Sequence, residues 1–263
     1  MQDPEIGSIV SMWQSMIQKK ASKVLGSSAV DLNSTEAYLR WHEGELSNWV
    51  CDVVAEDYSA DAGVQVCSGS SNTAAASALS SPLSHAPQRL PSVQKPDFAF
   101  LMVFTLAGKT IHPAGDITYG HLLSWLPKVV NIVVLKLTGE EVVKCLERGC
   151  GSLPGECGSL HHTSAELTYT IDLAVEKKKG RVKDVRFKGE PIEMERTYTV
   201  ACTEAMAAGK YGYDWMGVAP RVVEEEFATP LFDLLRDWLK KHKGEPPIQP
   251  DGEGTRIRIV NGP

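Results

Sequence analysis

One stretch, residues 115–147, constrains the fold more than any other part of the chain, because its hydrophobic period changes twice within it. Thr118 stands where a helix N-cap is expected, and Pro127 is compatible with the end of a short helix with the apolar residues Leu122, Leu123, Trp125 and Leu126. Residues 129–137 are too rich in β-branched side chains for a good helix and predict a buried strand. Thr138-Gly139 then turns the chain, and Thr138 can cap a second helix with the apolar stripe Val142, Val143 and Leu146. The pattern predicts one compact helix–strand–helix unit.

The composition limits the classes of function. A chain of 263 residues with 43% hydrophobic and 23% charged residues is typical of a globular protein with one large domain or two small ones. Its net charge of -6 gives no general attraction to nucleic acid. The sequence contains no run of about 18 apolar residues, so no membrane span is predicted. The N-terminus lacks a signal segment, so a cytoplasmic location is favoured; an extracellular one is compatible if an upstream signal was removed.

The N-terminal third predicts a helix and an insertion. Apolar residues recur at helical spacing over residues 6–24, which predicts an amphipathic helix. Residues 66–96 are rich in Ser, Ala and Pro and follow neither the helix nor the strand period. Such a segment buries too little apolar surface to offset its ordering entropy, which predicts a disordered insertion.

The other periodic segments indicate the fold class. The pattern predicts strands over 28–32, 98–106, 166–172, 181–187, 198–202 and 256–260, and helices over 45–58 and 230–239. Because helices and strands do not strictly alternate, we expect an α+β fold.

Three ordered motifs resemble a known family. They are Arg40-Trp-His-Glu-Gly-Glu-Leu-Ser-Asn-Trp-Val-Cys-Asp52, the unit at 115–147, and Arg196-Thr-Tyr-Thr-Val-Ala-Cys202 with Gly209-Lys-Tyr-Gly-Tyr213. Together they resemble the C-terminal domain of the 5'-nucleotidase family, which includes the UDP-sugar hydrolases and 2',3'-cyclic phosphodiesterases. The resemblance implies a layered α/β/β/α domain with mixed sheets that binds the substrate. An N-terminal metallophosphoesterase domain is the partner that it implies. The resemblance also implies that residues 1–24 form an interdomain-like helix ahead of the domain proper at 25–263.

The resemblance places catalysis in that other domain, where two divalent metal ions activate water. The present sequence has no Asp-x-His motif and no Gly-Asn-His-Asp or Gly-Asn-His-Glu motif. We therefore expect no catalytic residue, no metal site and no cofactor in this chain, which alone should not hydrolyse phosphate esters. The parent protein would be a metal-dependent phosphoric ester hydrolase.

The family's substrate-binding residues are only partly matched. Its first Arg matches Arg40, whereas its Asn-Gly-Gly-Gly-x-Arg segment falls on residues 105–110, which lack both recognition side chains. Lys128 stands where a base-stacking Phe is expected, and Tyr211 and Tyr213 fall on the family's Gly-Gly-Asp-Gly-Phe loop. The resemblance thus implies that the usual purine-binding residues are replaced. Arg40, Lys128, Tyr211 and Tyr213 are the predicted contacts of a nucleotide-like or phosphorylated small molecule.

Two other interpretations stay open. The chain could be a non-catalytic module that binds a protein partner and keeps only the scaffold of the family. The residues Cys145, Cys150, Cys157, His161 and His162 include types that bind zinc, but they lack a close Cys-x-x-Cys pair. We therefore expect reduced, packed cysteines and solvent-facing histidines.

Overall fold

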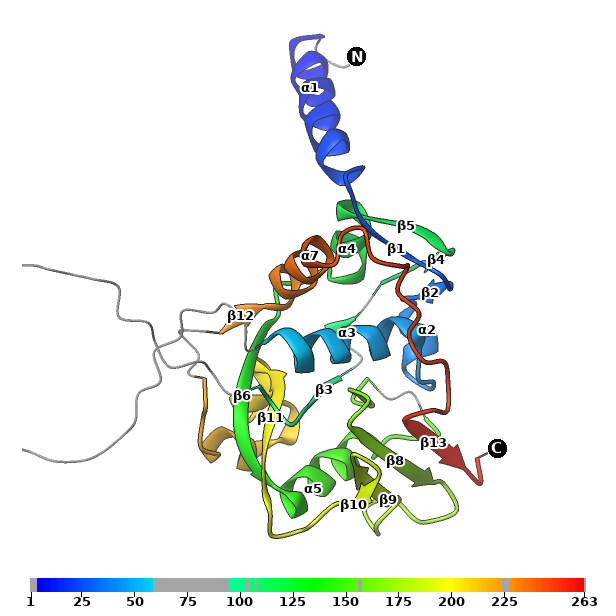
Figure 1. Cartoon of the computed structure of the whole chain (residues 1–263), viewed down its shortest axis with the longest axis vertical. Coiled ribbons are helices and arrows are strands. Elements are labelled where there is room, and N and C mark those ends of the chain that lie inside the picture. The colour runs from blue at the N-terminus through cyan, green and yellow to red at the C-terminus, as the bar shows by residue number, and fades with distance from the viewer. Residues whose placement is uncertain are drawn as a thin grey trace, which may run out of the picture.

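Two mixed β-sheets organise the chain in the computed structural model, which describes residues 4–58, 95–102, 105–106, 108–155, 158–223 and 228–262 (Figure 1). The larger sheet has the strand order β12-β6-β11-β3-β7, with β11 parallel to β3 and antiparallel to β6. Its strands are β3 (Phe98–Met102), β6 (Asn131–Thr138), β7 (His161–Thr163), β11 (Thr197–Thr203) and β12 (Thr229–Pro230). β3 is buried along its whole length, so it lies at the centre of the core.

The second sheet has the order β10-β9-β8-β13, and β13 pairs with β8 in parallel. Its strands are β8 (Leu167–Asp172), β9 (Val182–Phe187), β10 (Glu190–Pro191) and β13 (Ile257–Val260). Two further strand pairs, β1 with β5 and β2 with β4, are formed by β1 (Val24–Ser28), β2 (Leu32–Asn33), β4 (Ile111–His112) and β5 (Gly115–Thr118). Each of the two larger sheets combines parallel and antiparallel pairs, which confirms the predicted fold class of mixed sheets with helices.

The longer helices cover these sheets or extend from them. They are α1 (Pro4–Ala21), α3 (Glu45–Asp57), α4 (Tyr119–Trp125), α5 (Gly139–Gly149) and α7 (Leu231–Lys241). The short ones are α2 (Glu36–Leu39), α6 (Glu204–Ala207), η2 (Lys210–Gly212) and η3 (Asp214–Val218). α3 packs on β3, β7 and α7, whereas α5 packs on β6 and β9. α1 corresponds to the predicted helix at 6–24 and projects away from the sheets in Figure 1.

The predicted helix–strand–helix unit at 115–147 is present as α4, β6 and α5, and its two helix caps form as expected. Thr118 Oγ1 accepts a hydrogen bond from the His121 amide at the start of α4. Thr138 Oγ1 accepts one from the Glu141 amide at the start of α5, and the Glu141 carboxylate accepts one from the Thr138 amide. This reciprocal capping box satisfies amides that the helix itself leaves unpaired.

Other expectations are only partly met. The strand expected at 28–32 is instead divided between β1 and β2, because those two segments pair with β5 and β4. Most of the insertion expected at 66–96 lies outside the described residues. Among the described helices, none is both long and apolar enough to cross a lipid bilayer.

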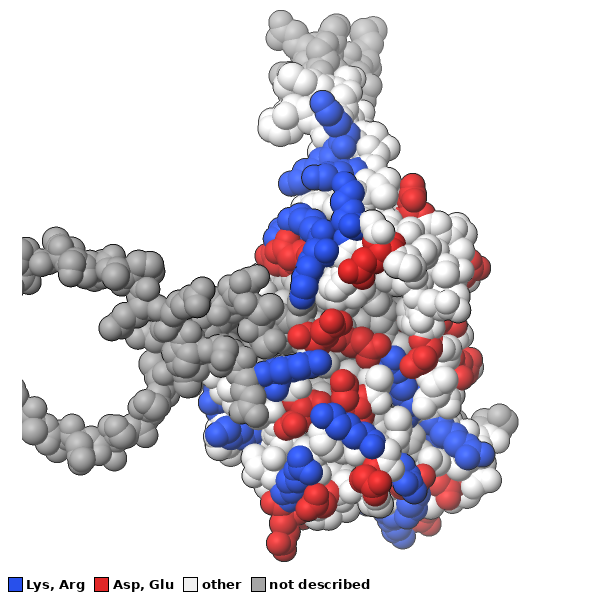
Figure 2. Space-filling model, viewed as in Figure 1, with Lys and Arg blue, Asp and Glu red and all other residues white. Residues whose placement is uncertain are grey.

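Charge is unevenly distributed on the face shown in Figure 2. Lysine and arginine side chains gather along the lower part of α1 and just beneath it, whereas acidic and basic side chains alternate over the rest of this face. Lys19 and Lys20 lie in the last turn of α1, and Lys240 and Lys241 lie in the last turn of α7. Cations at a helix C-terminus interact favourably with the helix dipole, so both clusters have a local structural reason.

Candidate functional site

A cavity of about 270 Å³ lies at one end of the larger sheet, where β3 and β11 end and β6 begins. The antiparallel register pairs Thr203, at the end of β11, with Ile132 near the start of β6. β3 runs parallel to β11, so its end at Met102 reaches the same end of the sheet. The cavity is lined from these strand ends and the loops beside them by Met102, Thr105, Lys128, Val129, Val130, Asn131, Thr203, Glu204, Ala205, Lys210 and Tyr211.

The polar groups of this cavity differ in how far they are already engaged. Asn131 Nδ2 donates a hydrogen bond of 2.6 Å to Glu204 Oε2, which fixes both side chains. The Thr203 hydroxyl is buried and has no hydrogen-bond partner among the described residues. Lys128 and Lys210 line the cavity and are exposed. Two cations and a free hydroxyl suit an anionic oxygen group on a ligand.

Tyr211 supplies the aromatic surface. Its backbone adopts a left-handed conformation with φ 61°, between the left-handed Gly209 and Gly212. The Tyr211 carbonyl oxygen accepts a 2.8 Å hydrogen bond from Arg148 Nη2, which anchors this loop to α5. Its side chain is 57% exposed, so the ring is free to contact a ligand at the cavity.

The structure therefore brings together two of the four predicted contact residues. Lys128 and Tyr211 line the cavity, whereas Arg40 and Tyr213 do not. The Arg40 guanidinium forms an ion pair with Glu36, four residues earlier in α2. Tyr213 is fully buried, and its hydroxyl lies 2.9 Å from Nε2 of His161. Tyr213 thus anchors its loop to the core and cannot stack on a ligand in this cavity.

The expectation of solvent-facing histidines is wrong. His161 and His162 lie in β7 and are at most 1% exposed. The ring nitrogens of His162 lie 2.9 Å from Ser47 Oγ and 3.2 Å from the Leu39 carbonyl oxygen. Burial away from water disfavours the charged imidazolium and lowers the pKa of His161 to about 3 and that of His162 to about 4.

The zinc alternative gains no support from the described residues. Cys145 and Cys150 are buried thiols outside any disulfide, as expected for packed cysteines, whereas Cys157 lies outside the described residues. Within the described ranges, no group of three or more His, Cys, Asp or Glu side chains could hold a metal ion. His161 and His162 are instead engaged with neighbouring polar groups of the core.

Sequence reasoning missed Thr203 and Asn131 as cavity residues. The only signal that could have found them is positional, since each lies at the end of a strand that meets the same sheet edge. Strand ends at a shared edge are a common place for ligand-contacting side chains. Finding them required the pairing of β6 with β11, which the pattern of one segment does not give.

This geometry defines a domain in which helices pack on two mixed sheets, with a cavity at the strand ends of the larger one. A family model described as "5'-nucleotidase, C-terminal domain" matches residues 24–217, and the chain belongs to this family. Among curated proteins, the chain is similar to Protein UshA of Escherichia coli (strain K12), with 27% identity over 128 residues, 49% of this chain and 22% of that protein. It is also similar to the Trifunctional nucleotide phosphoesterase protein YfkN of Bacillus subtilis, with 28% identity over 152 residues, 56% of this chain and 10% of that protein. The matches thus cover less than a quarter of these relatives.

Solved structures agree on the fold. The 5'-nucleotidase precursor from Thermus thermophilus superposes with a TM-score of 0.72 at 23% identity, over 100% of this chain and 44% of that one. A putative 5'-nucleotidase from Staphylococcus aureus gives a TM-score of 0.67 at 14% identity, over 95% of this chain and 43% of that one. At such identities the likeness shows the shared fold alone.

Proposed function

We propose that this chain is the substrate-recognition domain of a metal-dependent phosphoric ester hydrolase and that its cavity binds a phosphorylated small molecule. One observation carries the proposal: Lys128 and Lys210 line the same cavity as the exposed ring of Tyr211. Two ammonium groups attract a phosphate, and an aromatic ring gives stacking surface to the group attached to it. The hydroxyl of Thr203 adds a donor with no partner among the described residues.

The ligand of this cavity differs from the purine nucleotides that the family resemblance would suggest. The family resemblance places Lys128 at the position of one stacking ring and Ala205 at about that of the other, which leaves no pair of rings to hold a base between them. A nucleotide sugar or another phosphorylated compound is recognised chiefly through its charge. The chain alone does not hydrolyse it, because the sequence lacks the metal-binding motifs of the catalytic domain.

A thermal-shift and calorimetric panel tests this function. The probes are UDP-glucose, inorganic phosphate, AMP and adenosine, at low and high salt because exposed charge pairs are screened by salt. Binding of UDP-glucose or phosphate should weaken about fivefold in Lys128→Ala or Lys210→Ala, since an exposed charge contact is worth about 1 kcal/mol. Lys136→Ala is the matched control, because Lys136 is an exposed lysine outside the cavity.

The outcomes distinguish the proposal from its alternative. A reproducible shift with AMP or adenosine would contradict the loss of the purine clamp. If no phosphorylated probe binds, the cavity is idle and the non-catalytic interaction module becomes the better account. The chain can also be assayed for phosphate ester hydrolysis with added divalent metal. Activity that persists through purification and changes in Lys128→Ala would contradict the claim that this chain alone is not catalytic.

A further inference from the structure

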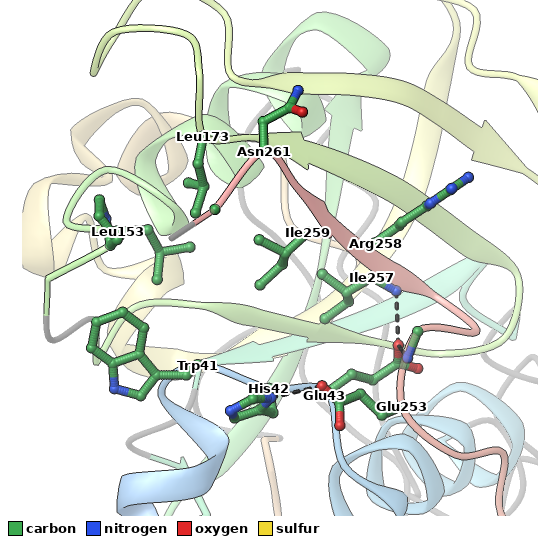
Figure 3. Close-up of a pocket in the computed structure, with 13 residues that line it drawn as sticks. Trp41, His42, Glu43, Leu153, Leu173, Glu253, Ile257, Arg258, Ile259 and Asn261 are labelled. Atoms are coloured by element: carbon green, nitrogen blue, oxygen red, sulfur yellow. Dashed lines mark hydrogen bonds and ion pairs between the residues drawn. The ribbon is translucent and has the colours of Figure 1, made fainter.

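A larger groove of about 730 Å³ lies beside β13, and none of its described lining residues belongs to the lysine-lined cavity. It is lined mainly by Trp41, His42 and Glu43 after α2, by Leu153 and Leu173, and by the segment from Glu253 to Gly262. In Figure 3, Trp41 and Leu153 stand across the groove from Ile257 and Ile259, and His42 with Glu253 closes one end. A volume of this size falls within the usual range of binding pockets.

One wall of the groove is the edge of a sheet. β13 is the terminal strand of the order β10-β9-β8-β13, and it pairs only with β8 among the described strands. The amides of Tyr169 and Leu173 donate to the carbonyl oxygens of Arg256 and Val260. In a parallel pair, successive residues of a strand turn their backbone groups alternately towards and away from the partner strand, so those of Ile257 and Ile259 point away from β8.

Glu43 occupies the first position of this edge. Its Oε2 accepts a 2.9 Å hydrogen bond from the Ile257 amide, as the dashed line in Figure 3 shows. Further along, the Ile257 carbonyl and both backbone groups of Ile259 have no hydrogen-bond partner among the described residues. An unpaired row of amides and carbonyls is a template for another strand.

The side chains around the groove favour a particular kind of occupant. Leu153 and Ile257 are nearly fully buried, and Trp41, Leu173 and Ile259 are half-buried, so the walls are largely apolar. The acidic side chains are already engaged, since Glu43 is held by backbone amides and Glu253 Oε1 lies 2.6 Å from His42 Nδ1. Arg258 is the one lysine or arginine among the described lining residues. This lining offers no cationic cluster for a phosphate and suits an uncharged chain.

We propose that this groove binds an extended peptide segment of a partner protein, which adds to the second sheet as a fifth strand along β13. The Ile259 amide and carbonyl and the Ile257 carbonyl would pair with the backbone of the peptide. Alternate side chains of a strand point to opposite faces, so every second side chain of the peptide would enter the groove. The apolar walls require an aliphatic or aromatic side chain there. This mode of recognition takes affinity from the main chain and specificity from the pocket.

The groove selects a single segment over a second copy of this chain. A second copy would have to bring a whole sheet to the edge, whereas the edge faces Trp41 and Leu153 across the groove (Figure 3). One extended strand fits between such walls. Because the proposed pairing uses three backbone groups, the contact is small and the expected affinity is that of a weak, transient interface.

Fluorescence anisotropy with labelled peptides tests the proposal on the full chain. The probes are nonapeptides of Ser and Thr with Leu or Phe at the centre, and the same peptides N-methylated at alternate amides. N-methylation keeps the side chains but removes main-chain donors. We expect binding of the Leu or Phe peptides and a loss of at least tenfold on N-methylation.

The protein variants address the edge and the wall separately. Ile259→Pro removes the outward amide, and proline is tolerated at an edge position whose N–H points away from the sheet. It should weaken peptide binding at least tenfold, while the matched control Ile259→Val stays within threefold of the unsubstituted chain. Trp41→Ala should weaken binding of the Phe peptide more than that of a peptide with Ala at its centre. If Ile259→Pro does not fold, the N-methylated peptides and Trp41→Ala decide the question.

Three results would overturn the proposal. One is the absence of binding by every peptide at millimolar concentration, and another is equal binding of the N-methylated peptides. The third is light scattering that shows a dimer for the unsubstituted chain and a monomer for Ile259→Pro, because a second copy would then occupy the edge. Binding of UDP-glucose at the lysine-lined cavity is expected to be unaffected by all these substitutions, so the two proposals fail independently.

Discussion

Acidification to pH 5 should destabilise the fold through the two buried histidines of β7. Their unfolded pKa is about 6.5, whereas burial lowers the folded pKa of His161 to about 3 and that of His162 to about 4. The unfolded chain therefore binds more protons than the folded chain between these values. The stability that depends on keeping these two histidines neutral is fully present above about pH 6.5. It is lost progressively as the pH falls towards 4.

The size of the effect follows from the distance between pH 5 and the unfolded pKa. At pH 5 the solution is about 1.5 pH units below the unfolded-state pKa of each histidine. Protonation of the unfolded chain therefore lowers the free energy of unfolding by about 2 kcal/mol for each histidine, or about 4 kcal/mol for both. A loss of that size lowers the melting temperature by roughly 8–16 °C for a chain of this length. Burial raises the pKa of the Asp52 carboxyl group, and a raised folded-state pKa acts in the opposite direction to that of the histidines on acidification.

Urea unfolding followed by tryptophan fluorescence at pH 7 and pH 5 measures this difference. His162→Gln should remove about half of the pH-dependent loss, because the amide cannot be protonated in this range. Ser47→Ala is the control: it removes a polar neighbour of His162 without a titrating group, so it should lower stability at both pH values and keep the difference between them. Equal stability of the unsubstituted chain at the two pH values, or folded-state imidazole signals that titrate near pH 6.5, would refute the reasoning.

Substitutions at three positions should destabilise the fold by distinct mechanisms, each measurable by urea unfolding at pH 7. Glu43→Gln places an amide group against the backbone donor of Ile257 and should cost about 1–3 kcal/mol, whereas Glu43→Asp tests whether reach or charge matters. Gly139→Ala should cost more than about 1 kcal/mol, because its Cβ would lie 2.3 Å from the Glu193 carbonyl oxygen; an unchanged midpoint would show that this turn can move. Tyr213→Phe should cost about 1–2 kcal/mol through loss of its hydroxyl contact with a buried histidine, and full retention of stability would contradict that role.

The parts of the fold that depend on neighbouring residues were predictable. Thr118 and Thr138 were expected as helix caps, and the hydroxyl of each accepts a hydrogen bond from the backbone amide three residues later. The Arg40–Glu36 ion pair also follows a local rule, since residues four apart on a helix are neighbours. Sequence analysis instead assigned Arg40 to a ligand on the basis of the family resemblance.

The parts that depend on distant residues were not predictable. Histidine is intermediate in burial preference, so nothing in the sequence around His161 indicates that Tyr213 would provide a buried partner 52 positions later. Lys128 and Tyr211 were chosen by analogy, whereas Thr203 joins them only because β6 and β11 pair in one register. The candidate site was thus predictable where the family motifs mark it and not where the register determines it.

The hydrogen bonds of Glu43 make the N-terminal half of the domain depend on residues 254–257, more than 200 positions later. This side chain is 2% exposed, and its carboxylate accepts from the amides of Gly254, Arg256 and Ile257. A buried carboxyl group without these donors is costly, so the segment around Glu43 cannot settle until residue 257 has left the ribosome. A fragment that stops at residue 217, where the family match ends, would leave the Glu43 carboxyl group without these donors.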